Sequence, residues 1–230
     1  MIAVGTPIVP DGTRRLCLGA GLVGALAFVA GLFIGDSIRA WQSLLVNFLF
    51  FGGLAQAGVV VSAIMQVTSS RWGRGLKRTA EATSAFFPIS FVLLVVLLLG
   101  TSTWMPWVHH PVEAKTPWLN IPFFVSRQLV GFFLLSGLSA LYVYRSLRAD
   151  IGQLDESAEV KATGISRRLI EGWQGTDAER DASQRSQSRL APVILIAYGW
   201  IFTLVGFDFF MSLEPHWFST LAGGYYFIGN

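Results

Sequence analysis

The chain has 230 residues, of which 53% are hydrophobic and 13% are charged. A typical soluble domain has about 25% charged residues, so this composition excludes an ordinary soluble globular protein. The net charge of +3 is a weak guide to partners and bears more on membrane orientation than on nucleic acid. The apolar residues fall in blocks of about 20, the length that crosses a bilayer as a helix. The sequence therefore predicts an all-α, polytopic transmembrane helical bundle with five full spanning helices and the start of a sixth.

The single cysteine limits the cofactors that the chain can hold. No CxxC or CxxCH motif and no cysteine–histidine array accompanies Cys17. The sequence thus has no motif for a covalent haem, an iron–sulfur cluster or a structural zinc. Cys17 lies in the first predicted spanning helix, Leu16–Ile34, which is too long for a signal-peptide core and has no cleavage site after it. Gly31 and Gly35 near its end would let a neighbouring helix approach closely.

The second predicted helix, Ser43–Val67, carries polar residues within an apolar segment. Asn47, Gln56, Ser62 and Gln66 spread over about half of the helix circumference, which suits a helix inside a bundle. Two interpretations are open. These residues form a polar track for protons or a quinone head group, or they make hydrogen bonds to neighbouring helices.

The third predicted helix, Thr79–Gly100, contains Pro88 near its start, where a kink is expected. The loop that follows is rich in tryptophan and proline. Trp104, Trp107 and Trp118 in this loop are predicted to form an aromatic belt at the membrane interface.

The same loop contains the adjacent histidines His109 and His110 and, shortly after them, Glu113. Three such residues suggest a metal site. However, adjacent histidines in a proline-bounded loop rarely point at one ion, and no further ligands lie nearby. We therefore expect a solvated loop and predict no metal site.

The fourth predicted helix runs from Asn120, a good N-cap, to Tyr144. Arg127 lies about 10 Å along its axis. An arginine at that depth either extends outward to the interface or pairs with a carboxylate.

The only long polar stretch, residues 145–189, separates an N-terminal part, residues 1–144, from a C-terminal part, residues 190–230. We expect it to be a cytoplasmic loop. Within it, Ala158–Trp173 is predicted to form a short helix along the membrane. The segment Asp177–Arg189 is expected to be disordered, or helical only in a complex.

The fifth predicted helix, Leu190–Met211, places Asp208 close to its far membrane boundary, and Glu214 followed by Pro215 ends the helix. Phe218–Asn230 is apolar but too short to span a bilayer. We expect it to begin a sixth helix, as in a fragment or a shortened relative of a longer protein.

Basic residues are distributed unevenly between the two sides of the bundle. Of the 17 Lys and Arg residues, 14 fall on the side of the N-terminus and the long polar loop, two fall on the other side, and Arg127 lies within a helix. This asymmetry predicts a cytoplasmic N-terminus, with Asp208, Glu214 and His216 on the outer side. Arg127 and Asp208 then lie at similar depth, and we predict that they pair. The alternative is that Arg127 extends outward alone.

Three segments resemble a known family. RLAPVILIAYGWIFTLVGFDFFMSLEPHWFSTLAGGYYF, with WLNIPFFVSRQ and LLVNFLFFGGLAQ before it, resembles the F-type membrane subunit of bacterial alternative complex III, which is related to the polysulfide reductase/NrfD group. The resemblance covers most of the chain from Trp41 onward. Members are about twice as long as this chain, with around ten spanning helices in two bundles.

The resemblance implies a subunit of a quinol:cytochrome c, or high-potential iron–sulfur protein, oxidoreductase in the bacterial inner membrane. It implies no covalently bound cofactor on this chain, a quinol (menaquinol or ubiquinol) held by one of two paralogous membrane subunits, and periplasmic iron–sulfur and haem c subunits as partners. Asp208, Glu214 and His216 would then accept or release protons, with Arg127 adjusting them. Arg127, Asn47 and Gln56 are candidates for quinone binding or for structural polar contacts.

Two functions from different classes remain in competition. The chain contributes to quinol binding or proton transfer, or it is a structural anchor for the periplasmic redox subunits while a paralogue binds quinol. In the second case the turn at Glu214 and His216 would dock a partner. A transporter is disfavoured because the helix breakers and charges gather at the outer boundary and not at the membrane midplane.

Overall fold

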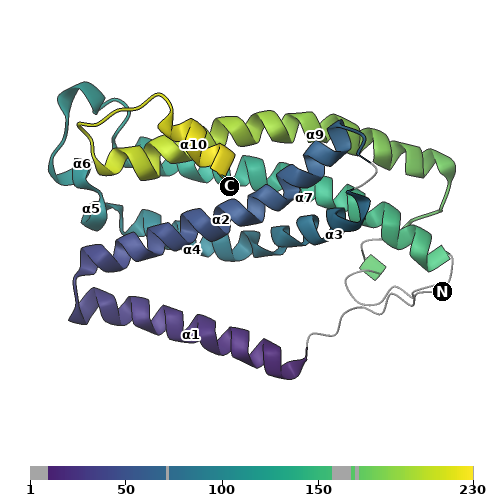
Figure 1. Cartoon of the computed structure of the whole chain (residues 1–230), viewed down its shortest axis with the longest axis horizontal. Helices are drawn as coiled ribbons and strands as arrows, with labels where there is room; N and C mark the ends of the chain where they lie inside the picture. Colours follow the sequence, from purple (N-terminus) through teal and green to yellow (C-terminus); the bar gives the residue numbers. More distant parts are fainter. Residues whose placement is uncertain (1–9, 71–72, 157–166, 169–170, 230) are drawn as a thin grey trace. The chain divides into compact units, whose positions relative to one another are not determined.

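The computed structural model describes residues 10–70, 73–156, 167–168 and 171–229. Every secondary-structure element in these ranges is helical, which confirms the all-α prediction (Figure 1). Five helical spans are long and apolar enough to cross a membrane: Asp11–Ile34, Ser37–Val67, Gly75–Leu99, Ile121–Gly152 and Asp177–Leu213. The chain divides into two compact units. We describe each by itself.

The first unit consists of Met1–Ala40 and Tyr144–Arg185. Its helix α1, Asp11–Ile34, has no buried residue. Asp36 ends the connection to α2, Ser37–Val67, by accepting a hydrogen bond of 3.0 Å from the Ile38 amide. A Cβ on Gly31 would lie 3.1 Å from the Cβ of Ala40, so the predicted close approach occurs at this turn.

The polar segment from Asp177 is helical in the structure, so the prediction of disorder there is wrong. It forms the start of α9, Asp177–Val205, which continues into the apolar fifth span. Because the apolar part nucleates the helix, the polar residues only extend it. Ser183 donates to the Arg145 carbonyl at 2.8 Å, and Arg148 pairs with Glu179 at 3.3 Å, which hold this extension against α7, Ile121–Glu156. Most of the predicted helix at Ala158–Trp173 lies outside the described residues.

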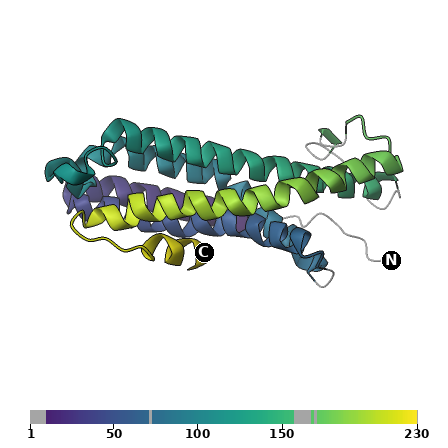
Figure 2. The same cartoon turned by 90° about the horizontal axis from the view of Figure 1, so that it is seen from above.

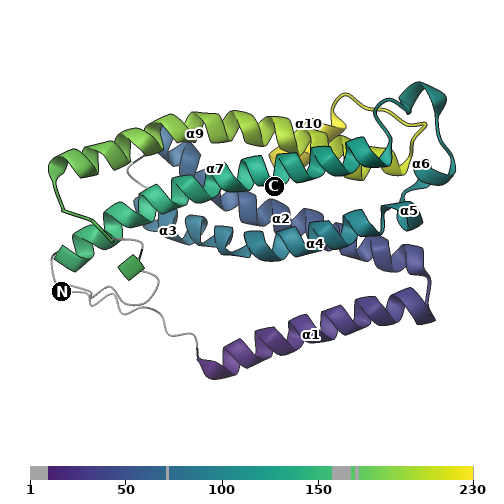
Figure 3. The same cartoon turned by 180° about the vertical axis from the view of Figure 1, so that it is seen from behind.

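The second unit, Trp41–Val143 with Ser186–Asn230, contains the bundle. In it α2, α4 (Phe87–Leu99), α7 and α9 run along a common direction (Figures 2 and 3). The short helices α5 (Thr101–Trp104), α6 (Pro106–His109) and η2 (Glu113–Lys115) lie at the same end as the turn after α9. Helix α10, Ala222–Gly229, lies beside the end of α9.

Pro88 disrupts the third span, as predicted. Before it, α3 (Arg74–Ala82) changes into the 3₁₀ turn η1 (Thr83–Phe86). Proline has no N–H to donate to the carbonyl four residues earlier. That carbonyl, of Ser84, accepts from the Phe87 amide instead.

The core of this unit is aromatic and lies at one end. Phe209 contacts Phe48 and Phe124 with ring centroids 5.7 and 5.3 Å apart, and it stacks on Trp104 at 6.3 Å. Trp104 and Trp107 are only 4% and 3% exposed. The predicted interfacial belt is therefore wrong for these two residues, because α5 and α6 fold back over the bundle end. Only Trp118 of the three is exposed, at 39%. We call this end the tryptophan end.

Close helix packing depends on Gly58 of α2. A Cβ at this position would lie 2.2 Å from both the Ala80 carbonyl oxygen and the Thr83 hydroxyl oxygen. Backbone atoms cannot move aside without shifting α3, so only glycine fits here.

We predict that Gly58→Ala lowers the free energy of unfolding by about 1–3 kcal/mol, the usual effect of overpacking. Thermal unfolding of the purified protein in detergent would measure the change. Gly137→Ala is the matched control, because a Cβ on Gly137 meets no atom within 4 Å and alanine favours the helix. Equal stabilities of the two variants would contradict the packing described here.

Candidate functional site

The end of α9 carries an acidic residue on an irregular turn. After Val205 the helix widens into the π-helical segment η3, Gly206–Phe210, followed by the 3₁₀ turn η4, Met211–Leu213. Asp208 lies in the π segment and is 0% exposed. Ser212 donates its hydroxyl to the Asp208 carbonyl, which satisfies a carbonyl that the irregular turn leaves available. Single π turns within helices often mark functional sites.

Arg127 and Asp208 form a bidentate ion pair, which confirms the predicted pairing. Arg127 Nε donates to Asp208 Oδ2 at 2.7 Å, and Nη2 donates to Oδ1 at 2.8 Å. The Arg127 side chain is 8% exposed, so it does not extend outward alone. Two parallel charge-assisted bonds of this kind fix both geometry and charge.

Two further donors complete the shell around the Asp208 carboxylate. Trp118 Nε1 donates to Oδ1 at 3.1 Å, and Gln128 Nε2 donates to Oδ2. The Arg127 guanidinium lies 4.1 Å from the Trp118 ring centroid and 4.5 Å from that of Phe123. A buried carboxylate is tolerated only when it is paired and hydrogen-bonded, and here four donors from three side chains supply both.

Glu214 and His216 do not join this cluster. Both are exposed, while Pro215 between them is buried. Lys115 holds their turn from the loop at the tryptophan end by donating to the carbonyls of Pro215 and Trp217 at 2.5 and 3.3 Å. Within the described residues, no direct hydrogen bond or ion pair joins either side chain to Asp208. Any proton transfer among the three predicted residues would need water between them.

The polar residues of α2 make mostly interhelical contacts. Gln56 donates to Ser139 at 2.8 Å, and Gln66 donates to Ser188 at 3.0 Å. Ser62 lies 3.2 Å from the Tyr142 hydroxyl. Asn47 is exposed and donates only to the carbonyl of Ser43, one turn earlier, at 2.8 Å. Three of the four thus tie helices together, as the second interpretation holds.

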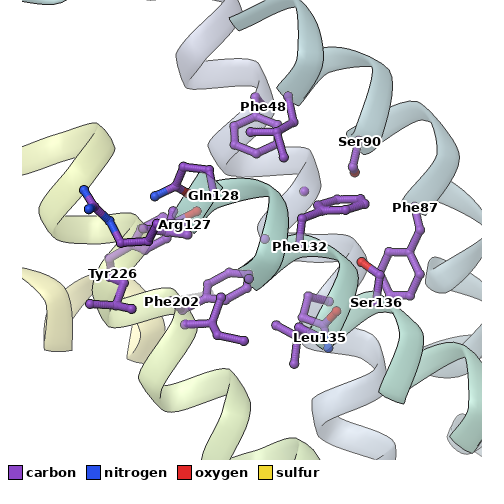
Figure 4. Close-up of a pocket in the computed structure, with 18 residues that line it drawn as sticks. Phe48, Phe87, Ser90, Arg127, Gln128, Phe132, Leu135, Ser136, Phe202 and Tyr226 are labelled. Carbon is purple, nitrogen blue, oxygen red and sulfur yellow. The ribbon is translucent and has the colours of Figure 1, made fainter. Parts of the chain in front are cut away.

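A cavity opens between α2, α4, α7, α9 and α10, beside the ion pair (Figure 4). Its volume is about 70 Å³, several times the roughly 10–15 Å³ that one water molecule needs. Aromatic and aliphatic side chains form most of its wall. The polar side chains in the wall are Gln56, Ser90, Arg127, Gln128 and Ser136, with Tyr226 from α10.

Sequence reasoning misses several of these contacts. Gln128 and Ser90 have no motif around them, and the composition of the loop predicts an interfacial position for the indole of Trp118. Glu81 of α3 is also missed; it is 2% exposed, pairs with Arg78 and accepts a hydrogen bond of 2.8 Å from Ser62. The spacing of Glu81 three and four residues after Arg78 and Lys77 is the available signal.

The adjacent histidines His109 and His110 are exposed, as is Glu113. In the part of the chain that the structure describes, no three His, Cys, Asp or Glu side chains lie close enough to hold a metal ion.

These features define a multi-pass membrane protein with a buried ion pair next to an apolar cavity. No protein-family model matches the sequence, and no curated protein matches it.

We predict that Arg127→Ala lowers the free energy of unfolding by about 3–5 kcal/mol, because it leaves the Asp208 charge buried without its main partner. Adding Asp208→Asn should restore part of this loss, since the neutral amide needs no cation. Denaturation in detergent of the wild type, both single variants and the double variant measures the coupling. Strictly additive losses would argue against the pairing.

Proposed function

We propose that this chain is an integral membrane subunit of a quinol:cytochrome c, or quinol:high-potential iron–sulfur protein, oxidoreductase. The cavity is the observation that carries this proposal, and the resemblance to the alternative complex III family supports it. A quinol site needs an apolar slot for the ring, a few groups that bind the ring oxygens, and a route for the released protons. The cavity supplies the first two, and the ion pair beside it supplies a candidate for the third.

Gln128 connects the cavity to the ion pair. Its side chain lines the cavity, and its amide nitrogen donates to Asp208. A proton released from a ring hydroxyl near Gln128 would thus leave next to a carboxylate whose charge Arg127 stabilises. From there, Glu214 and His216 on the exposed turn are the proposed exit groups, reached through water.

Orientation in the membrane is part of the same proposal. The asymmetry of Lys and Arg favours a cytoplasmic N-terminus in a bacterial inner membrane, with the tryptophan end on the periplasmic side. Periplasmic iron–sulfur and haem c subunits would then contact this end, and a paralogous membrane subunit would lie beside the bundle. Electrons would pass to those partners, because this chain has no motif for a covalently bound redox centre.

A specific observation also favours the second function, a structural anchor. Lys115 holds the turn with Glu214 and His216 in place and leaves both side chains exposed. A rigid, exposed turn suits docking of a periplasmic subunit, in which case the paralogue binds the quinol.

For the quinol-binding role, we predict that Gln128→Met in the assembled complex lowers kcat/KM for quinol about tenfold. Methionine keeps the volume but removes the polar group, while Arg127 and Trp118 still hold Asp208. Steady-state quinol:cytochrome c activity measures the effect. Ser126→Ala, an exposed position on the same helix, is the matched control and should leave activity unchanged. Wild-type kcat/KM in Gln128→Met would favour the anchor function.

His216→Ala separates the proton-exit role from docking. If His216 releases protons, we expect kcat to fall at least threefold with full assembly of the complex, a modest part of what general acid–base groups contribute. If the turn is a docking element, the periplasmic subunits should dissociate during purification. His109→Ala, also exposed at this end, is the control. Full activity with full assembly would exclude both roles for His216.

A further inference from the structure

One polar group in the cavity wall has no partner. Ser90 of α4 is 1% exposed, and its hydroxyl oxygen makes no hydrogen bond within the described residues. A hydroxyl that is buried without a partner destabilises the folded protein, so such groups are rare and call for an explanation. In Figure 4, Ser90 projects from its helix into the space beside Phe48 and Phe132.

The amides in the same wall are different, because each is already engaged. Gln56 donates to Ser139, and Gln128 donates to Asp208. Among these residues Ser90 is thus the group with its full hydrogen-bonding capacity left for a ligand.

Glycine at position 52 keeps the space next to Ser90 open. A Cβ built on Gly52 would lie 3.7 Å from Ser90 Oγ and 3.7 Å from the Phe48 ring. A methyl group fits at these distances without strain. A larger side chain would occupy the space in front of the hydroxyl.

We propose that Ser90 binds an edge oxygen of a ring-shaped ligand in this cavity. The ligand class is a ring with apolar faces, which pack on the aromatic wall, and a carbonyl or hydroxyl oxygen at its edge. A serine hydroxyl donates to a carbonyl and accepts from a hydroxyl, so it suits both the oxidised and the reduced form of such a ring. That the ring is a quinol rests on the proposed function.

The test compares Ser90→Ala with wild type by thermal unfolding of the full chain in detergent. The probes are a short-chain ubiquinone analogue and a hydrocarbon ring of similar size without oxygen. Without a probe, Ser90→Ala should melt at the same temperature or higher, because it removes an unsatisfied hydroxyl. With the quinone, its affinity should fall roughly three- to tenfold, the value of one hydrogen bond, while hydrocarbon binding stays unchanged.

Two further variants make the test specific. Ser139→Ala should lower the melting temperature without any probe, because it leaves Gln56 buried without its partner. Gly52→Val should weaken both probes by filling the cavity.

The outcomes separate this inference from the proposed function. Quinone binding that is equal in wild type and Ser90→Ala overturns the role of Ser90 and leaves the quinol proposal standing. Binding of a ring alcohol, but not of the quinone, that depends on Ser90 supports the site and contradicts the quinol proposal. No stabilisation of wild type by any of these rings overturns the site itself.

Discussion

The buried ion pair between Arg127 and Asp208 is the constraint on which the tryptophan end of the bundle depends. Neither charge is stable in an apolar interior alone, so each fixes the position of the other. The pair joins α7 to the π segment after α9, and Trp118 and Gln128 bring the preceding loop and the cavity wall to the same carboxylate. The turn that carries Glu214 and His216 follows from this anchored point.

The polar groups of the bundle fall into two kinds by their hydrogen bonds. Gln56, Ser62 and Gln66 are satisfied by neighbouring helices, which explains how α2 tolerates them in an apolar environment. Ser90 is buried without a partner among the described residues, and it lies where the packing leaves space. The contrast locates a ligand site more sharply than composition does, because every polar residue looks alike in a hydropathy pattern.

The length of the apolar blocks was sufficient to predict the five spans, and similar depth in the membrane was sufficient to predict the Arg127–Asp208 pair. Residues whose role depends on tertiary contacts could not be predicted in the same way. Trp104 and Trp107 have the composition of an interfacial belt, but the fold of α5 and α6 buries them. The segment from Asp177 has the composition of a disordered loop, yet α9 extends through it. The partners of Gln128 and Glu81 were equally invisible, because each depends on a helix distant in the sequence.

The distance in sequence between Arg127 and Asp208 has a consequence for synthesis of the protein. The two residues are 81 positions apart. At about 5–20 residues per second, the ribosome completes α7 several seconds before the carboxylate is made. During that interval the arginine enters the bilayer unaccompanied, where its insertion is unfavourable. Stable seating of α7 therefore waits for α9, and the order of translation becomes a step in assembly.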